Sequence, residues 1–132
     1  MAPVRVFLVD DNLEFLQAEL ELLCEYFEIV GTATDGKSVL AGVDRCKPDV
    51  VVLDVSLGDL TGFDVARQLK SAGSPARIVF LTAHEGEEFV SAALRLGVSG
   101  YVCKSQASED LTRAIRAASC GQTFFPPHPG GI

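Results

Sequence analysis

Polar side chains follow four of the short apolar runs in this sequence, at the point where each run ends. The runs and the polar residues after them are Val4 to Val9 with Asp10 and Asp11, Val50 to Leu53 with Asp54, Ile78 to Leu81 with Thr82, and Gly100 to Cys103 with Lys104. If these runs are strands of one sheet, three carboxylates, a hydroxyl and an ammonium group meet at one edge. Three carboxylates in contact repel one another, and at least one pKa rises unless a cation lies among them.

A hard divalent cation with oxygen ligands would remove that repulsion. Mg²⁺ suits such a site because it binds one or two protein carboxylates, keeps several waters and takes phosphate oxygens as further ligands. Neither of the two histidines lies near enough to these acids in sequence to indicate a nitrogen-ligated metal such as Zn²⁺. The residues therefore predict a magnesium site.

Asp54 is the best candidate nucleophile at this edge, because it stands alone at the end of the central run. Lys104 could neutralise charge on a phosphoryl group, and Thr82 could donate a hydrogen bond to one of its oxygens. The Asp54 carboxylate could then attack phosphorus and form an aspartyl phosphate. Taken singly, the same residues fit helix caps, turns and solvated side chains, so only their joint placement favours chemistry.

The elements that must position these residues are strands alternating with helices. A fifth strand is predicted at residues 29–33. The helices are predicted from apolar spacing, caps and breakers: a first with Leu13, Leu16, Leu20, Leu23 and Phe27 on one face, a second with Val39, Leu40 and Val43 that Pro48 ends, a third that Thr61 and Asp64 cap, a fourth from about Glu87 to Leu96 that Gly97 ends, and a last capped by Ser108. This alternation predicts an α/β domain whose parallel sheet binds ligands beyond the carboxyl ends of its strands.

Composition limits the classes of protein to consider. The 132 residues suit one domain, and a net charge of −7 without any run of Lys or Arg argues against nucleic-acid binding by this segment alone. No apolar stretch approaches the length of a membrane span or resembles a signal peptide, so we expect a cytoplasmic protein without membrane contact. The four cysteines show no C-x-x-C spacing and are expected to be reduced thiols.

The ordered set of motifs resembles the receiver domain of two-component response regulators. It consists of Asp10-Asp11, Asp54 within Val-Val-Leu-Asp-Val, Thr82-Ala83, and Tyr101 three residues before Lys104. The resemblance runs from about Val4 to Gly121 and implies a (βα)5 flavodoxin-like fold, a doubly wound five-stranded parallel sheet with strand order 2-1-3-4-5. Similarity to the NarL/FixJ subfamily lies in five stretches: Glu87 to Leu94, Gly97, Gly100-Tyr101, Lys104-Ser105, and Leu111 to Arg116.

The resemblance implies a role for each matching residue. Asp54 would be the phosphoacceptor, and Thr82 and Lys104 would contact the phosphoryl group. The Mg²⁺ ligands would be Asp10, Asp11, Asp54 and the Ser56 backbone carbonyl. Thr82 and Tyr101 would form the switch, in which the aromatic ring turns inward as the threonine moves toward phosphate. Ser56 and His84, two residues past Asp54 and Thr82, would tune the rate of hydrolysis.

The resemblance also implies partners and domain limits. A sensor histidine kinase would donate the phosphoryl group, and the domain would not be an enzyme beyond its own phosphorylation and dephosphorylation. Phosphorylation would promote a homodimer. Residues 1–121 would be the receiver and residues 122–132 the start of a linker or a tail, with DNA bound by a helix-turn-helix domain that this chain lacks.

Two departures from the family pattern and three alternatives remain at this point. The loop from Ser56 to Gly62 has no proline, and Ser105 follows Lys104 where many receivers have proline, so we expect a trans peptide bond there. The main alternative is an unphosphorylated pseudo-receiver that acts as a docking module. An aspartate-nucleophile phosphatase would need an acid at Asn12, and a flavin-binding domain would need a phosphate-binding loop in place of Asp10-Asp11.

Overall fold

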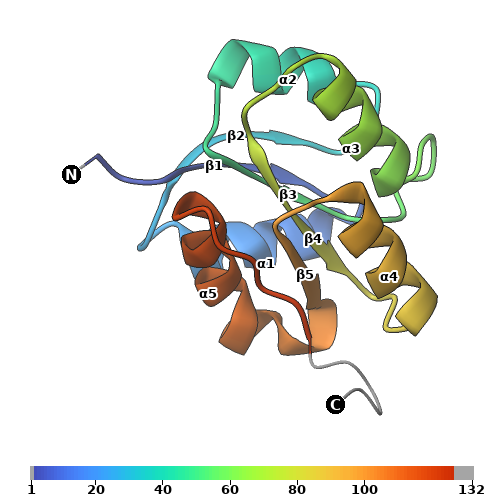
Figure 1. The fold of residues 1–132 in the computed structure, drawn as a ribbon. Helices are drawn as coiled ribbons and strands as arrows, with labels where there is room; N and C mark the ends of the chain where they lie inside the picture. Colours follow the sequence, from blue (N-terminus) through green and yellow to red (C-terminus); the bar gives the residue numbers. More distant parts are fainter. Residues whose placement is uncertain (1, 127–132) are drawn as a thin grey trace.

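Five parallel strands form a single sheet in the computed structural model, which describes residues 2–126 (Figure 1). The strands are β1 (Arg5–Val9), β2 (Glu28–Ala33), β3 (Val50–Leu53), β4 (Arg77–Thr82) and β5 (Gly100–Cys103), and the helices are α1 (Leu13–Leu23), α2 (Val39–Cys46), α3 (Gly62–Ser71), α4 (Glu87–Leu96) and α5 (Ala107–Ser119). Their order across the sheet is β2-β1-β3-β4-β5, with every neighbouring pair parallel. The predicted doubly wound α/β fold is confirmed.

Helices cover both faces of the sheet. Figure 1 shows α1 and α5 on one face and α2, α3 and α4 on the other. The central strand β3 is apolar throughout because Val51 and Leu53 pack toward α2, α3 and α4, while Val50 and Val52 pack toward α1 and α5. All four are fully buried, as expected for a parallel strand covered on both sides.

Local sequence chemistry sets the limits of α3 and α4 as predicted. The Thr61 hydroxyl accepts a hydrogen bond from the Asp64 N–H, and the Asp64 carboxylate accepts one from the Thr61 N–H, which completes a capping box. Helix α4 ends at Gly97, which has φ 81°, a left-handed conformation that glycine adopts without strain.

Three predicted features of the helices are wrong. Phe27 does not belong to the first helix, because α1 ends at Leu23. Leu13 does not share the buried face of α1 but is 68% exposed at the first position of the helix. Ser108 is not a cap, because a 3₁₀ turn at Lys104–Gln106 leads directly into α5 and places this serine in the first helical turn.

The chain after α5 runs beside β5. Phe124 forms a parallel bridge with Gly100, and its backbone bonds to both neighbours of that glycine: its N–H donates to the Ser99 carbonyl, and its carbonyl accepts from the Tyr101 N–H, each at 2.9 Å. Phe124 belongs to the segment predicted as the start of a linker, residues 122–132. Residues 127–132 of that segment lie outside the described residues.

The expected trans bond at Lys104-Ser105 is confirmed, since residues 2–126 contain no cis peptide bond.

None of the helices within residues 2–126 is both long and apolar enough to cross a membrane.

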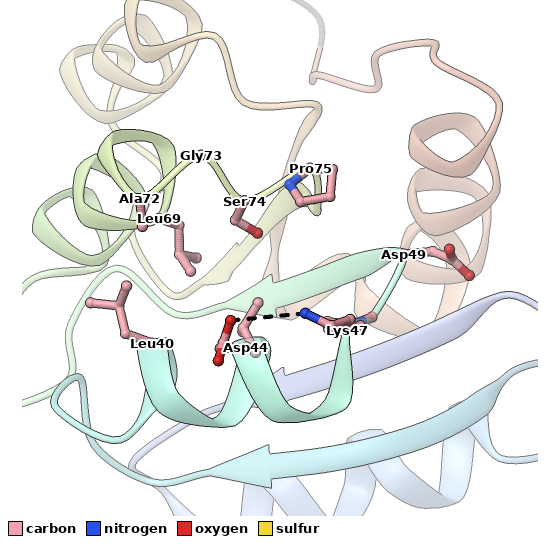
Figure 2. A pocket seen from close by; sticks show the side chains of 11 residues that line it. Leu40, Asp44, Lys47, Asp49, Leu69, Ala72, Gly73, Ser74 and Pro75 are labelled. Carbon is pink, nitrogen blue, oxygen red and sulfur yellow. Dashed lines mark ion pairs between the residues drawn. The ribbon is translucent and has the colours of Figure 1, made fainter.

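A hollow of about 340 Å³ lies at the edge where the strands begin, here called the amino edge. Figure 2 shows it between α2 and α3, with Leu40 and Leu69 on either side and Asp44 paired to Lys47 at 3.9 Å. The predicted site residues lie at the other end of the strands, here called the carboxyl edge. The hollow and the predicted chemistry are therefore at opposite edges of the sheet.

Candidate functional site

The three predicted acids meet at the carboxyl edge. Val9 and Leu53 are paired residues at the ends of β1 and β3, so the residues that follow them, Asp10 and Asp54, leave the sheet side by side. One carboxylate oxygen from each of Asp10, Asp11 and Asp54 lies within 4.8 Å of the others. Asp10 and Asp54 are buried and Asp11 is exposed, so the group is open to solvent on one side.

Lys104 joins the acids from the end of β5. Its Nζ lies 2.8 Å from Asp54 Oδ2 and 2.9 Å from Asp10 Oδ2, with only 14% of the side chain exposed. Burial alone would lower the pKa of Lys104, but the contacts with Asp54 and Asp10 outweigh it and raise that pKa above its ordinary value. Phe15 on α1 places its ring 4.3 Å from Nζ, which further favours the charged form.

The composition of this group fits Mg²⁺. All the donor atoms are oxygens, three carboxylates stand against a single ammonium group, and Asp11 leaves an open side for water and phosphate ligands. The Ser56 N–H donates to Asp54 Oδ1 at 3.2 Å, which fixes the orientation of the carboxylate. The role of the Ser56 carbonyl as a metal ligand stays a prediction.

Thr82 ends β4 and is fully buried next to Cys103, its partner residue on β5. Its hydroxyl oxygen accepts a hydrogen bond from the His84 N–H at 3.2 Å. Register therefore puts this hydroxyl one residue from the position of Lys104, at the same edge as Asp54.

His84 connects more of the site than its sequence position indicated. Its Nε2 lies 2.8 Å from the Ser56 hydroxyl, and its ring stacks on Phe89 of α4 with centroids 4.4 Å apart. Its carbonyl accepts a hydrogen bond from the Tyr101 hydroxyl at 2.7 Å. Tyr101 is fully buried, and this burial raises its pKa well above the ordinary value. The two predicted rate-tuning residues thus contact each other, and the two predicted switch residues both contact His84.

The loop after Asp54 is held in place without proline. Asp59 accepts hydrogen bonds from the N–H groups of Gly36 and Lys37, at 2.9 and 3.1 Å, and these bonds lower the pKa of Asp59. At the other end of the loop, a Cβ at Gly62 would lie 2.3 Å from the Asp54 carbonyl oxygen. Only glycine permits that close approach, so α3 begins directly against the end of β3.

Sequence reasoning missed Glu19, which lies beneath this site on α1. It is only 2% exposed, and its pKa is raised to about 9, first by burial and then by a hydrogen bond and charge repulsion from Asp10. The signal was present, because Glu19 stands three residues after Leu16 and four before Leu23, on the apolar face of the predicted helix.

Comparison with known proteins gives the same family throughout. The response regulator receiver domain model matches residues 6–116. The transcriptional regulatory protein DesR of Bacillus subtilis is 31% identical over 94% of this chain and 62% of its own length. The DNA-binding transcriptional activator DevR/DosR of Mycobacterium tuberculosis is 35% identical over 92% of this chain and 57% of its own length. The chain thus spans about half the length of the curated relatives it matches.

Solved structures of response regulators have the same fold as this chain. A LuxR-family response regulator from Aurantimonas superposes with a TM-score of 0.90 at 30% identity, covering 96% of this chain and 91% of that one. The signal receiver domain of the NarL response regulator from Mycobacterium tuberculosis gives 0.87 at 27% identity, covering 92% and 100%. Fold, register of the acidic edge and sequence similarity agree, and the chain belongs to the response regulator receiver domain family.

Proposed function

We propose that this receiver takes a phosphoryl group from a sensor histidine kinase onto Asp54 and changes its surface to control transcription. The observation that carries the proposal is the setting of Asp54. It is buried at the end of the central strand, bonded to Lys104 at 2.8 Å, and has oxygens of Asp10 and Asp11 within 4.8 Å. The relatives' names as transcriptional regulators support the output, and a cytoplasmic location suits a kinase partner.

The Asp54 carboxylate would act as the nucleophile. One of its oxygens forms a bond to phosphorus as the phosphorus–nitrogen bond of the kinase phosphohistidine breaks, and the leaving nitrogen keeps the electron pair and takes up a proton. Lys104 pairs with the Asp54 carboxylate and would then contact the phosphoryl oxygens, with the Thr82 hydroxyl as a further donor.

Asp10, Asp11, Asp54 and the Ser56 carbonyl would hold Mg²⁺, which when bound neutralises charge on the phosphoryl oxygens. The buried ion pair between Lys104 and Asp10 would hold the Asp10 carboxylate in place at this metal site. The domain is then a phosphoacceptor that promotes only its own phosphorylation and dephosphorylation.

The switch would run through His84. When the Thr82 hydroxyl turns to a phosphoryl oxygen, the hydrogen bond that it accepts from the His84 N–H breaks. The loop that carries the His84 carbonyl can then move together with the Tyr101 hydroxyl that donates to this carbonyl. The phosphoryl group biases this element by bonding better to one arrangement than to the other.

Intact mass after incubation with acetyl phosphate tests the chemistry. The wild type should gain one phosphoryl group with Mg²⁺ and none with a chelator, and Asp54→Asn should gain none. Asp44→Asn, an acid at the amino edge, is the control and should be labelled like the wild type. Labelling of Asp54→Asn at full stoichiometry would place the acceptor elsewhere, and no labelling of the wild type would favour the pseudo-receiver alternative.

Phosphorylation is further proposed to promote pairing of two domains through the face formed by α4, β5 and α5, or through α1 and α5. Tyr101 lies on β5 between the two helices of the first face, and Leu94 exposes half of its surface on α4. Sedimentation with and without beryllofluoride and Mg²⁺ should show a monomer turning into a dimer. An activated form that stays monomeric at high micromolar concentration would exclude pairing by the receiver alone.

A further inference from the structure

Residues 122–126 add a short segment to the free edge of the sheet. β5 is the last strand in the order β2-β1-β3-β4-β5, so these five strands leave one side of its backbone unpaired. Phe124 occupies that side through its parallel bridge with Gly100, and Figure 1 shows the chain after α5 running along β5. The segment therefore covers backbone groups that an edge strand otherwise offers to another chain.

Two backbone hydrogen bonds hold the segment on β5. The Phe124 N–H donates to the Ser99 carbonyl, and the Phe124 carbonyl accepts from the Tyr101 N–H, each at 2.9 Å. A Cβ added at Gly100 would make a tight contact of 3.2 Å with the Phe124 carbonyl oxygen. The absence of a side chain at Gly100 thus leaves room for the segment beside β5.

Two successive aromatic side chains anchor the segment on opposite faces of the sheet. Phe124 packs against the buried cluster under α1 and α5, and Phe125 packs against the cluster on the other face, which includes Tyr101. Such alternation is that of a strand. Both phenylalanines are half-buried, whereas Gln122 and Thr123 are exposed. A segment held by two aromatic side chains and two backbone bonds opens at a lower cost in free energy than the buried strands beside it.

Tyr101 joins this segment to the proposed switch. Its backbone N–H donates to Phe124, and its hydroxyl donates to the His84 carbonyl at 2.7 Å. The His84 N–H in turn donates to the Thr82 hydroxyl, and this is the bond that the proposed switch breaks. The docked segment and the bond between Thr82 and His84 therefore belong to the same arrangement of β5 and the His84 loop.

We propose that residues 122–126 are an autoinhibitory edge strand, which is docked on β5 while Thr82 bonds to His84 and is loosened through Tyr101 when Asp54 is phosphorylated. The inference rests on the proposed function and adds the regulation of its β5 face. The docked segment opposes activation, and activation weakens docking by the same factor, because the coupling between two binding equilibria is reciprocal. Release uncovers the edge of β5, which belongs to a face proposed for pairing.

Calorimetric titration with beryllofluoride at saturating Mg²⁺ tests this coupling. The double variant Phe124→Ser, Phe125→Ser removes both anchors, keeps the length of the chain and leaves the acids of the carboxyl edge unchanged. It should lower the beryllofluoride Kd about fivefold. Loss of folding weakens binding, so it does not explain a lower Kd. The matched control, Gln122→Ser with Thr123→Ser at the exposed positions of the same segment, should bind like the wild type.

Tyr101→Phe tests the route of the coupling. This change removes the hydrogen bond to the His84 carbonyl but keeps the ring and the backbone bond to Phe124. In the Tyr101→Phe background, the double serine change should alter the beryllofluoride Kd by less than about twofold. A fivefold effect that persists in this background overturns the role of Tyr101.

Hydrogen exchange in the wild type gives a second readout that needs no variant. Beryllofluoride with Mg²⁺ should speed exchange of the Phe124 amide hydrogen about fivefold, whereas the Val52 amide in the central strand should not speed up. This measurement decides the question if the double serine variant does not fold.

The outcomes separate the inference from the proposed function. A wild type that binds no beryllofluoride overturns the phosphoryl site, and the inference with it. A wild type that binds, with an unchanged or higher Kd in the double serine variant, overturns the inhibitory role of the segment alone. Exchange at Phe124 that stays the same or slows on adding beryllofluoride overturns it as well.

Discussion

At the carboxyl edge of the sheet, Lys104 contacts Asp54 and Asp10 within 2.9 Å, and all three side chains are largely buried. At the amino edge, Lys47 lies 3.9 Å from Asp44, and these side chains are 77% and 88% exposed (Figure 2). Both edges thus hold lysines and aspartates, but only one holds them out of water. The amino edge has the hollow, and the carboxyl edge has the strong electrostatics. Burial of charge, and not this hollow, distinguishes the edge that carries the proposed function.

The sharpest way to break this comparison is to remove one lysine from each edge. Lys104→Met leaves Asp10 and Asp54 buried without their cation, and we expect the free energy of unfolding in chelator to fall by about 3 kcal/mol. Lys47→Met removes an exposed pair and should change it by less than about 0.5 kcal/mol. Urea denaturation of both variants measures this difference.

Saturating Mg²⁺ provides the control for this prediction. A divalent cation among the acids should restore part of the stability lost in Lys104→Met and none of the small change in Lys47→Met. Equal losses at the two edges would contradict the conclusion that burial separates them.

The second prediction concerns pH and belongs to the carboxyl edge alone. Glu19 has a pKa of about 9 in the folded protein against 4.5 as its ordinary value, and it faces Asp10, Asp54 and Lys104. Between these values the folded state holds a proton that the unfolded state has lost, so the free energy of unfolding should fall as pH rises from 4.5 toward 9. Denaturation in chelator across this range measures the slope.

Glu19→Gln should remove most of that slope, because the amide does not titrate. Stability curves of Glu19→Gln and wild type that run parallel across the range would show that Glu19 holds no extra proton in the folded protein.

The smallest expected effect concerns the lifetime of the phosphoryl group. His84 bonds to Ser56 and stacks on Phe89 at the open side of the site. His84→Ala should open a path for water and speed dephosphorylation several-fold, and Ser56→Lys should also change the rate. Intact mass followed over time gives the rate, and Ser74→Lys at the amino edge is the control. Unchanged rates in both site variants would confine the two residues to a structural role.

The positions of Asp10, Asp54, Thr82 and Lys104 could be predicted from sequence because strand ends in a parallel sheet share one edge. The fold followed from the same alternation. Other features depended on contacts between segments far apart in the chain. The bond between Ser56 and His84 joins two loops 28 residues apart, and neither loop alone indicates it.

Periodicity also gave incomplete information on α1. It identifies the face of the helix that packs on the sheet, but not which positions of that face are covered, and Leu13 at the first position is exposed. Glu19 also lies on the apolar face of α1, but the spacing within the helix does not indicate its contact with Asp10, which follows β1. The 3₁₀ turn at Lys104–Gln106 leads into α5 at Ala107, so the helix begins before Ser108.

Tyr101 belongs to two distant parts of the molecule at once. Its hydroxyl bonds to the His84 carbonyl at the site, and its backbone N–H bonds to the Phe124 carbonyl in the segment that follows α5. In mechanical terms, Tyr101 couples the loop of His84 to the segment that follows α5. Tension on the chain at Phe124 would act on β5 through the hydrogen bonds to Ser99 and Tyr101, and would reach the His84 loop through the Tyr101 hydroxyl.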